Sequence, residues 1–422
     1  MRSFSLMKLF KSIFLSVVFV LIIFTPNITF LPYYTWILAF GGILCLLDSS
    51  YRKLIKFNKK SNKIFLITLF ISTIYNGIIV PFVHFSGDLT YIPLLIGIIL
   101  TFFRNILLVF ILHKFANVDN IFKEYTKYFF IACSIYVAFT LYFIINPGFK
   151  DFWFNSVIIP PQEHSFLAYQ FRYSLDGFAA FASATVFSFA CLFCSFIIAS
   201  EQDFSYFNIV CLLLFVIGCF FYGRVSLIGM LLGATMILSN KEQKGKTLKI
   251  VFIVVVIILL LLVYLNTLSK INDDIAIWTD WAFAFVRQLF IEKEVTDHSV
   301  THMFEDMYFM PELTTLIWGD GKYTNPDHSY YMHTDVGFMR LILYGGLLGL
   351  ILTYKTIFCL CENIKRNTNS IYFRRFVNLT LVLFVVLEMK GESYQRFIMQ
   401  LYPIFLIINY QNSLNENCCK RK

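Results

Sequence analysis

Charged residues are scarce in this chain. Asp, Glu, Lys and Arg make up 14% of its 422 residues, whereas soluble domains average about a quarter. Hydrophobic residues reach 58%, and the mean hydropathy is +0.70. This composition excludes an ordinary soluble domain and is typical of a polytopic membrane protein.

Several chemical signatures are also missing. The sequence has no Walker A loop, no dinucleotide-binding fingerprint and no nucleophile elbow. Ten cysteines are present, but the long polar segments 147–175 and 269–335 contain none, so we expect no disulfide framework. Cys191-Leu-Phe-Cys194 lies in an apolar run without a second pair of cysteines. Its position favours core packing over a metal or redox site.

The net charge of +9 does not predict a nucleic-acid partner. Nucleic-acid binding needs basic residues gathered on one soluble face. Here they are scattered between apolar segments, as the positive-inside rule describes for membrane proteins.

Stretches apolar enough to cross a bilayer recur along the whole chain. We predict about twelve, most of them about 17 to 22 residues long. The predicted spans are 8–25, 28–47, 64–83, 92–112, 128–146, 176–199, 208–222, 225–239, 250–268, 336–354, 376–390 and 397–411. The predicted fold class is therefore an all-α polytopic membrane protein, with residues 1–422 forming one integral membrane domain.

The basic connections set the predicted orientation. Placing the N-terminus in the cytoplasm puts most Lys and Arg inside and makes both termini cytoplasmic. No small-x-small cleavage site follows residues 24–27, so the first apolar stretch is expected to be a retained helix.

Two long segments, 147–175 and 269–335, then form outer loops. The larger one precedes the last three helices, and connections of this size usually form lids or binding surfaces. Within it, 278–290 places aromatic and apolar side chains on one helical face. We predict an amphipathic helix that lies at the membrane surface or, alternatively, packs on the transmembrane bundle.

Four arginines fall at or near outer helix ends in this topology: Arg172, Arg224, Arg340 and Arg396. An ionisable side chain at the bilayer centre costs about 2.5 to 3.5 kcal/mol, so a retained one usually faces a cavity, a partner or an interface. The four together predict an anion-binding site. For any one of them, snorkelling to lipid phosphates is the alternative.

Arg224 interrupts the apolar run 209–238, which would be about 45 Å long as one helix. A bilayer core needs about 30 Å, so we predict a tight hairpin at Gly223-Arg224. Gly229 and Gly233 form a GxxxG pattern, which lets a neighbouring helix approach closely.

A second polar stretch concentrates His328, His333, Asp335 and Arg340 before and within a glycine-rich apolar helix. Such a set can supply a proton acceptor beside a cation that steadies a leaving phosphate.

Two other polar clusters carry weaker predictions. His298 and His302 are spaced four residues apart, but the glutamate of HExxH metalloproteases is missing, so we predict no metal there. A short turn before the last helix is flanked by Glu388, Lys390, Glu392 and Arg396, where ion pairs that close the turn are favoured over a role of Arg396 in the phosphate site.

The sequence resembles the bacterial O-antigen polymerase and ligase superfamily in four segments. They are Gly223-Arg-Val-Ser-Leu-Ile-Gly-Met-Leu-Leu-Gly233, Trp318-Gly-Asp-Gly321, His333-Thr-Asp-Val-Gly-Phe338 and Tyr344-Gly-Gly-Leu-Leu-Gly-Leu350. The layout of about twelve helices with a large loop before the last three is also similar. In the ligase branch a histidine followed by asparagine leads into the late helix, whereas His328 is followed by Ser329, so the polymerase branch is favoured.

The resemblance implies glycosyl transfer at the periplasmic face of the bacterial inner membrane. It implies an undecaprenyl-pyrophosphate-linked glycan as donor, another as acceptor, a surface polysaccharide such as O-antigen or capsule as product, and no cofactor or metal. Arg224, Arg172, Arg340 and Arg396 would bind the pyrophosphate, with Asp335, His328 or His333 as the base. Membrane lipid and a chain-length regulator are the other expected partners. A flippase for the same lipid-linked sugars and a ligase are the alternatives.

Overall fold

Helices dominate the computed structural model, and the all-α membrane class is confirmed. The structure describes residues 2–55, 60–115, 121–158, 172–178, 181–201, 205–239, 301–327 and 329–419, with single residues between 245 and 279. Five helical segments in these ranges are long and apolar enough to cross a membrane: Asn62–His84, Ile92–Phe115, Ile121–Ile145, Phe181–Ser200 and Gly337–Arg366. Twelve spans, the outer loops and the cytoplasmic termini stay predictions.

Several predicted features fall on other parts of the chain. The span 250–268 and the amphipathic helix 278–290 lie largely outside the described residues, and His298 and His328 lie wholly outside them.

The chain divides into two compact units. Unit 1 comprises Met1–Ile23, Tyr33–Tyr128 and Met303–Lys422, and unit 2 comprises Phe24–Pro32 and Phe129–His302. Each unit is therefore built from segments that are distant in sequence.

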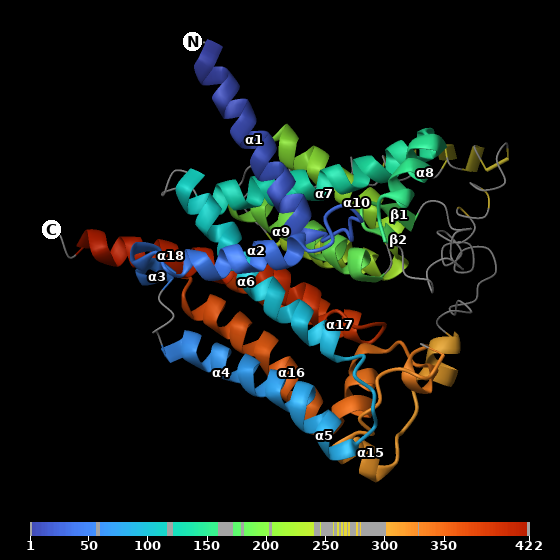
Figure 1. Cartoon of the computed structure of the whole chain (residues 1–422). Coiled ribbons are helices and arrows are strands. Elements are labelled where there is room, and N and C mark those ends of the chain that lie inside the picture. The colour runs from blue at the N-terminus through green and yellow to red at the C-terminus, as the bar shows by residue number, and fades with distance from the viewer. Residues whose placement is uncertain are drawn as a thin grey trace. The chain divides into compact units, whose positions relative to one another are not determined.

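Unit 1 contains most of the helices (Figure 1). They are α1 (Arg2–Ile23), α2 (Tyr34–Cys45), α3 (Ser49–Ile55), α4 (Lys60–Ile74), the π-helical turn η1 (Tyr75–Ile79), α5 (Val80–His84), α6 (Ile92–Phe115), α15 (Leu313–Trp318), α16 (Gly337–Arg366), α17 (Ile371–Glu388) and α18 (Tyr394–Cys419). Helices α2 and α18 pack against α6, while α16 packs along α4 and also contacts α15, α17 and α18.

A group of hydrogen-bonded polar side chains lies within the apolar interface between α4 and α16. The buried Asn76 amide donates to Ser72 O and Thr353 Oγ1, both at 3.1 Å. A Cβ atom at Gly345 or Gly349 would lie 2.9 Å from Asn76 Oδ1. The glycines of the Tyr344-Gly-Gly-Leu-Leu-Gly stretch thus make room for this asparagine.

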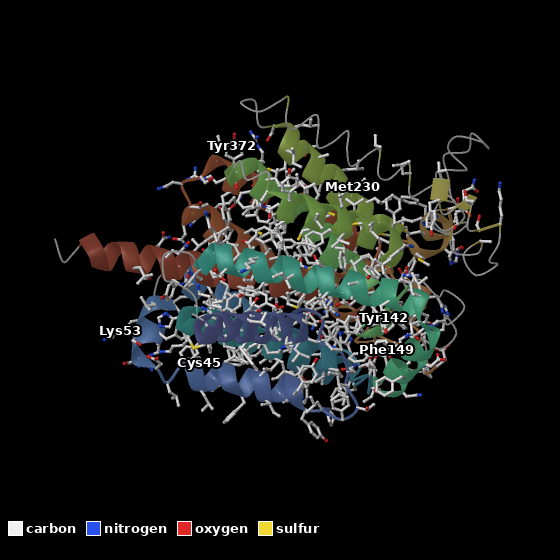
Figure 2. The ribbon with its side chains drawn as sticks, turned by 90° about the horizontal axis from the view of Figure 1, so that it is seen from above. Cys45, Lys53, Tyr142, Phe149, Met230 and Tyr372 are labelled. Carbon is white, nitrogen blue, oxygen red and sulfur yellow. The ribbon has the colours of Figure 1, made fainter. Side chains whose placement is uncertain are left out.

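Unit 2 contains most of α7 (Ile121–Ile145), α8 (Pro147–Asn155), a two-stranded hairpin of β1 (Tyr173–Ser174) and β2 (Gly177–Phe178), α9 (Phe181–Glu201), α10 (Tyr206–Tyr222) and α11 (Leu227–Leu238). Aromatic side chains join the end of α7 to α8 and the hairpin. Figure 2 labels Tyr142 and Phe149 of this region, whose ring centroids are 5.0 Å apart. The predicted outer loop 147–175 therefore holds a helix and a strand.

The predicted division of 209–238 is confirmed. Helix α10 ends at Tyr222, Arg224–Ser226 form a 3-10 turn, and α11 begins at Leu227. The GxxxG prediction is also confirmed, because a Cβ at Gly229 would lie 2.2 Å from Ser188 O, and one at Gly233 would lie 2.5 Å from Ser195 Oγ. Helices α9 and α11 can approach this closely only with glycine at both positions.

Candidate functional site

The Trp318-Gly-Asp-Gly321 turn of unit 1 is bound to the backbone of α16. Gly346 interrupts the helix with φ of 66° and ψ of −173°, and a Cβ there would lie 2.2 Å from Ile317 O. The amides of Asp320 and Gly321 donate to Leu343 O (2.7 Å) and Tyr344 O (3.0 Å). The Trp318-Gly-Asp-Gly turn and the glycine-rich start of α16 therefore form one structural feature. The kink at Gly346 leaves the carbonyls of Leu343 and Tyr344 free to accept the amides of the turn.

The turn between α5 and α6 forms hydrogen bonds with residues 321–324, at and just after the Trp318-Gly-Asp-Gly321 turn. Asp88 Oδ2 accepts the amides of Tyr323 (2.6 Å) and Thr324 (2.9 Å), and Ser86 Oγ donates to Gly321 O at 2.6 Å. Although burial opposes the charged form, these amides and the Thr90 hydroxyl bring the pKa of Asp88 below its ordinary value.

Arg340 is enclosed in the first turn of α16. Its guanidinium lies between the rings of Tyr323 and Tyr330, at 4.0 and 3.8 Å from their centroids. Arg340 Nη1 pairs with Glu392 Oε2 at 3.2 Å, and both side chains are at least nine-tenths buried. Glu392 therefore pairs with a residue outside the group for which ion pairs that close the turn are predicted, because Arg340 comes from another helix.

Glu392 lies in the turn between α17 and α18 and also accepts the Tyr323 hydroxyl. Burial raises its pKa, although the Arg340 charge and the tyrosine oppose this shift. Burial and the Glu392 charge together raise the pKa of Tyr323 well above its ordinary value. Arg340, Tyr323 and Glu392 form one charge-balanced cluster that fixes the start of α16.

A strained turn precedes Asp335. In the 3-10 turn Tyr331–His333, both Met332 (φ 55°) and His333 (φ 54°) have left-handed backbone conformations, which cost non-glycine residues of order 1 to 3 kcal/mol each. Asp335 follows two residues later, and its Oδ1 atom is buried without a hydrogen-bond partner among the described residues. Burial and this carboxylate raise the pKa of the nearby Tyr308 hydroxyl.

A cavity of about 580 Å³ opens beside the strained turn. Its polar lining residues are His84, Glu312, Thr315, Asp320, Lys322 and Tyr331, and Met332 of the strained turn lines it too. Asp320 accepts hydrogen bonds from Thr315 Oγ1 (2.7 Å) and Tyr331 OH (3.1 Å), so the carboxylate is oriented. Polar groups of both charges beside a tyrosine ring suit a neutral, hydroxyl-rich ligand such as a sugar.

Unit 2 holds the other two predicted arginines at one turn. Arg172 precedes β1, its Nη2 donates to Tyr222 O at 3.2 Å, and its guanidinium lies 4.8 Å from the Phe178 ring centroid. Tyr222 is two residues before Arg224, so the structure brings Arg172 to the hairpin that carries Arg224. Both arginines are partly exposed.

The structure therefore places the predicted residues in two groups. His333, Asp335, Arg340 and Arg396 belong to unit 1, and Arg172 and Arg224 belong to unit 2. Sequence reasoning missed Arg104, the buried arginine of α6, although a charge inside the apolar run 92–112 is a visible signal. It also gave no role to His84 and Asp88, whose partners lie more than 230 residues away.

Among the described residues, no group of three or more His, Cys, Asp and Glu side chains could hold a metal ion. Comparisons with models of known protein families, with curated protein sequences and with solved structures gave no match.

Proposed function

We propose that the protein is a membrane glycosyltransferase that polymerises oligosaccharide repeat units carried on undecaprenyl pyrophosphate. The observation that carries the proposal is the strained turn at Met332 and His333, which shortly precedes Asp335, whose buried Oδ1 has no hydrogen-bond partner among the residues that the structure describes. Strained backbone and unpartnered buried polar groups are unfavourable and persist only where the surrounding structure stabilises them. They are found most often at functional sites.

In the proposed reaction an acceptor sugar hydroxyl attacks the anomeric carbon of the donor glycan. The new glycosidic bond forms as the bond from that carbon to the pyrophosphate oxygen breaks, and the hydroxyl proton passes to Asp335 or His333. Polyprenyl pyrophosphate leaves with the bonding electrons. Within unit 1, Arg396 is the proposed ligand of its charge, whereas Arg340, which is paired with Glu392, positions the turn that carries Asp335. The anion-binding roles of Arg172 and Arg224 stay predictions from the sequence.

The cavity beside Tyr331 is the proposed seat of a sugar unit. Its volume lies within the range of about 300 to 1,000 Å³ that is usual for small-ligand sites. The Tyr331 ring can stack on a sugar face, while Asp320 and Glu312 can accept its hydroxyl protons in hydrogen bonds.

The test uses full-length protein in liposomes with lipid-linked repeat units, and product length is read on a gel. Asp335→Asn is expected to lower the polymerisation rate by a factor of about 10² or more. Asp327→Asn is the matched control, because Asp327 is an exposed carboxylate of the same loop that accepts the Ser329 amide and hydroxyl. If Asp335→Asn combined with His333→Ala kept wild-type chain lengths at equal expression, the assignment of the base would be wrong.

Deleting the gene in its host separates the candidate activities. Loss of a polymerase should leave a single repeat unit on the carrier or the lipid acceptor. Loss of a flippase should leave none, and loss of a ligase should leave long unattached chains. Either of the last two patterns would contradict the proposal.

A further inference from the structure

Helix α6 carries a buried arginine far from its ends. Arg104 is twelve residues after Ile92, which corresponds to about 18 Å along the helix axis. Its exposed fraction is 5%, although the helix is one of the five that are apolar enough to cross a membrane. An ionisable residue at this depth usually marks a functional site.

Arg104 lacks a neutralising partner among the described residues. Its Nη2 donates to Thr101 Oγ1 at 2.6 Å. Within the described part of the chain, its Nε is buried without a hydrogen-bond partner and no acidic side chain forms an ion pair with it. A buried cation without a paired carboxylate is costly, so an anion at this point would be strongly bound.

Helix α18 brings further donors to the same place. The Asn105 amide donates to Met399 O at 3.3 Å, which holds this stretch of α18 against α6 beside Arg104. Arg396 and Gln400 are four residues apart and therefore share one face of α18. Gln400 is 1% exposed, and neither polar atom of its amide has a hydrogen-bond partner in the ranges that the structure describes. Arg396 lies near enough to Arg104 for their positive charges to repel each other.

We infer that Arg104, Arg396 and Gln400 form a binding site for the phosphate group of a membrane lipid between α6 and α18. A phosphate offers several acceptor oxygens and a negative charge, which match the free Nε of Arg104, the Gln400 amide and two guanidinium groups. A lipid is the source because the site lies along an apolar helix, where phosphate dissolved in water is excluded. The inference does not require the protein to transfer glycosyl groups.

Native mass spectrometry of the full-length protein in detergent tests the site. The probes are phosphatidylglycerol, undecaprenyl pyrophosphate, inorganic pyrophosphate and, as the zwitterionic control, phosphatidylcholine. The variants are Arg104→Gln and Gln400→Leu, with Arg366→Gln as the matched control because that arginine is 72% exposed at the far end of α16.

We expect Arg104→Gln to lower the occupancy of the bound anionic lipid about tenfold, and Gln400→Leu to lower it several-fold. Arg366→Gln should leave it unchanged. Preferential binding of phosphatidylglycerol assigns a structural lipid, and preferential binding of undecaprenyl pyrophosphate assigns a lipid-linked glycan carrier. Inorganic pyrophosphate should not compete for the site, and competition by it would contradict a lipid source.

Unchanged occupancy in Arg104→Gln would overturn the inference, as would equal binding of phosphatidylcholine. Because Gln400→Leu removes only a neutral amide, it keeps the test valid if Arg104→Gln fails to fold. Loss of lipid binding with normal polymerisation would separate this inference from the proposed function.

Discussion

Two buried arginines in unit 1 have opposite surroundings. Arg340 is paired with Glu392 and stacked between two tyrosines, so its charge is balanced by the protein. Arg104 is buried as deeply, but it has only the Thr101 hydroxyl as a hydrogen-bond acceptor among the described residues. Burial of a charge is therefore not enough to identify its role. A balanced cation holds structure together, whereas an unbalanced one is suited to bind an anion from outside the protein.

Removing the charge of Glu392, which balances Arg340, should lower the stability of the protein more than any of the other substitutions below. Glu392→Gln leaves Arg340 buried without a counter-ion, and we expect a loss of about 3 to 5 kcal/mol in the free energy of unfolding. Thermal unfolding in detergent measures it. Glu362→Gln is the control, because Glu362 makes exposed pairs with Lys365 and Arg366, and should change stability by less than about 0.5 kcal/mol. Equal losses of stability in both variants would mean that the buried Arg340–Glu392 pair contributes no more than an exposed ion pair.

The loop that encloses Arg340 depends on a glycine. Gly346→Ala places a Cβ 2.2 Å from Ile317 O at a residue with φ of 66°, and we expect a loss of at least about 2 kcal/mol. Gly87→Ala is the matched control, since φ is 68° but nothing lies within 4 Å of the added Cβ. Gly87→Ala should lose only about 1 kcal/mol of stability, which is the cost of placing a residue with a Cβ atom in the left-handed backbone conformation. The difference between the two melting temperatures isolates the contact, and no difference would contradict it.

Arg104→Met should affect stability in the opposite direction from Glu392→Gln. Because the substitution removes a buried, unbalanced charge, we expect stability in lipid-free detergent to stay within about 1 kcal/mol of wild type or to rise. Adding phosphatidylglycerol should then stabilise the wild type and not the variant. A large loss of stability in the lipid-free protein would show that Arg104 has a structural role like that of Arg340.

Substitution of Asp88 should have the smallest effect on stability, and this effect should appear only at acidic pH. Its pKa lies below the ordinary 3.8, so its contribution to stability is present above pH 3.8 and is lost as the pH falls through the lower folded-state value. Asp88→Asn should therefore flatten the fall in melting temperature between about pH 5 and pH 3. An unchanged slope would mean that other carboxylates dominate acid unfolding.

Local features were predicted best from the sequence. Run length and Gly223-Arg224 placed the hairpin between α10 and α11, because a helix of 30 apolar residues is longer than a bilayer requires. The GxxxG pattern predicted a close helix contact but could not identify α9 as the partner. Apolar length also located α6 and α16 to within a few residues at their first turns.

The site itself was only partly predictable. The sequence placed Asp335 and His333 near a helix start, but it does not show the left-handed backbone at Met332. The pairing of Arg340 with Glu392 depends on a contact between segments that are distant in sequence. Arg104 could have been found as a charge within an apolar run, although only tertiary structure shows that its buried Nε has no hydrogen-bond partner in the described part of the chain.

Composition and periodicity by themselves determined that this chain forms apolar helices, since few charges and long hydrophobic runs permit little else in a bilayer. Tertiary structure decided which charges are balanced. A side chain's electrostatic partner is whichever group the packing of distant helices brings within a few ångströms, and no local pattern encodes that distance. The Trp318-Gly-Asp-Gly turn shows the same division, because its glycines are evident in the sequence while the α16 carbonyls that they approach are not.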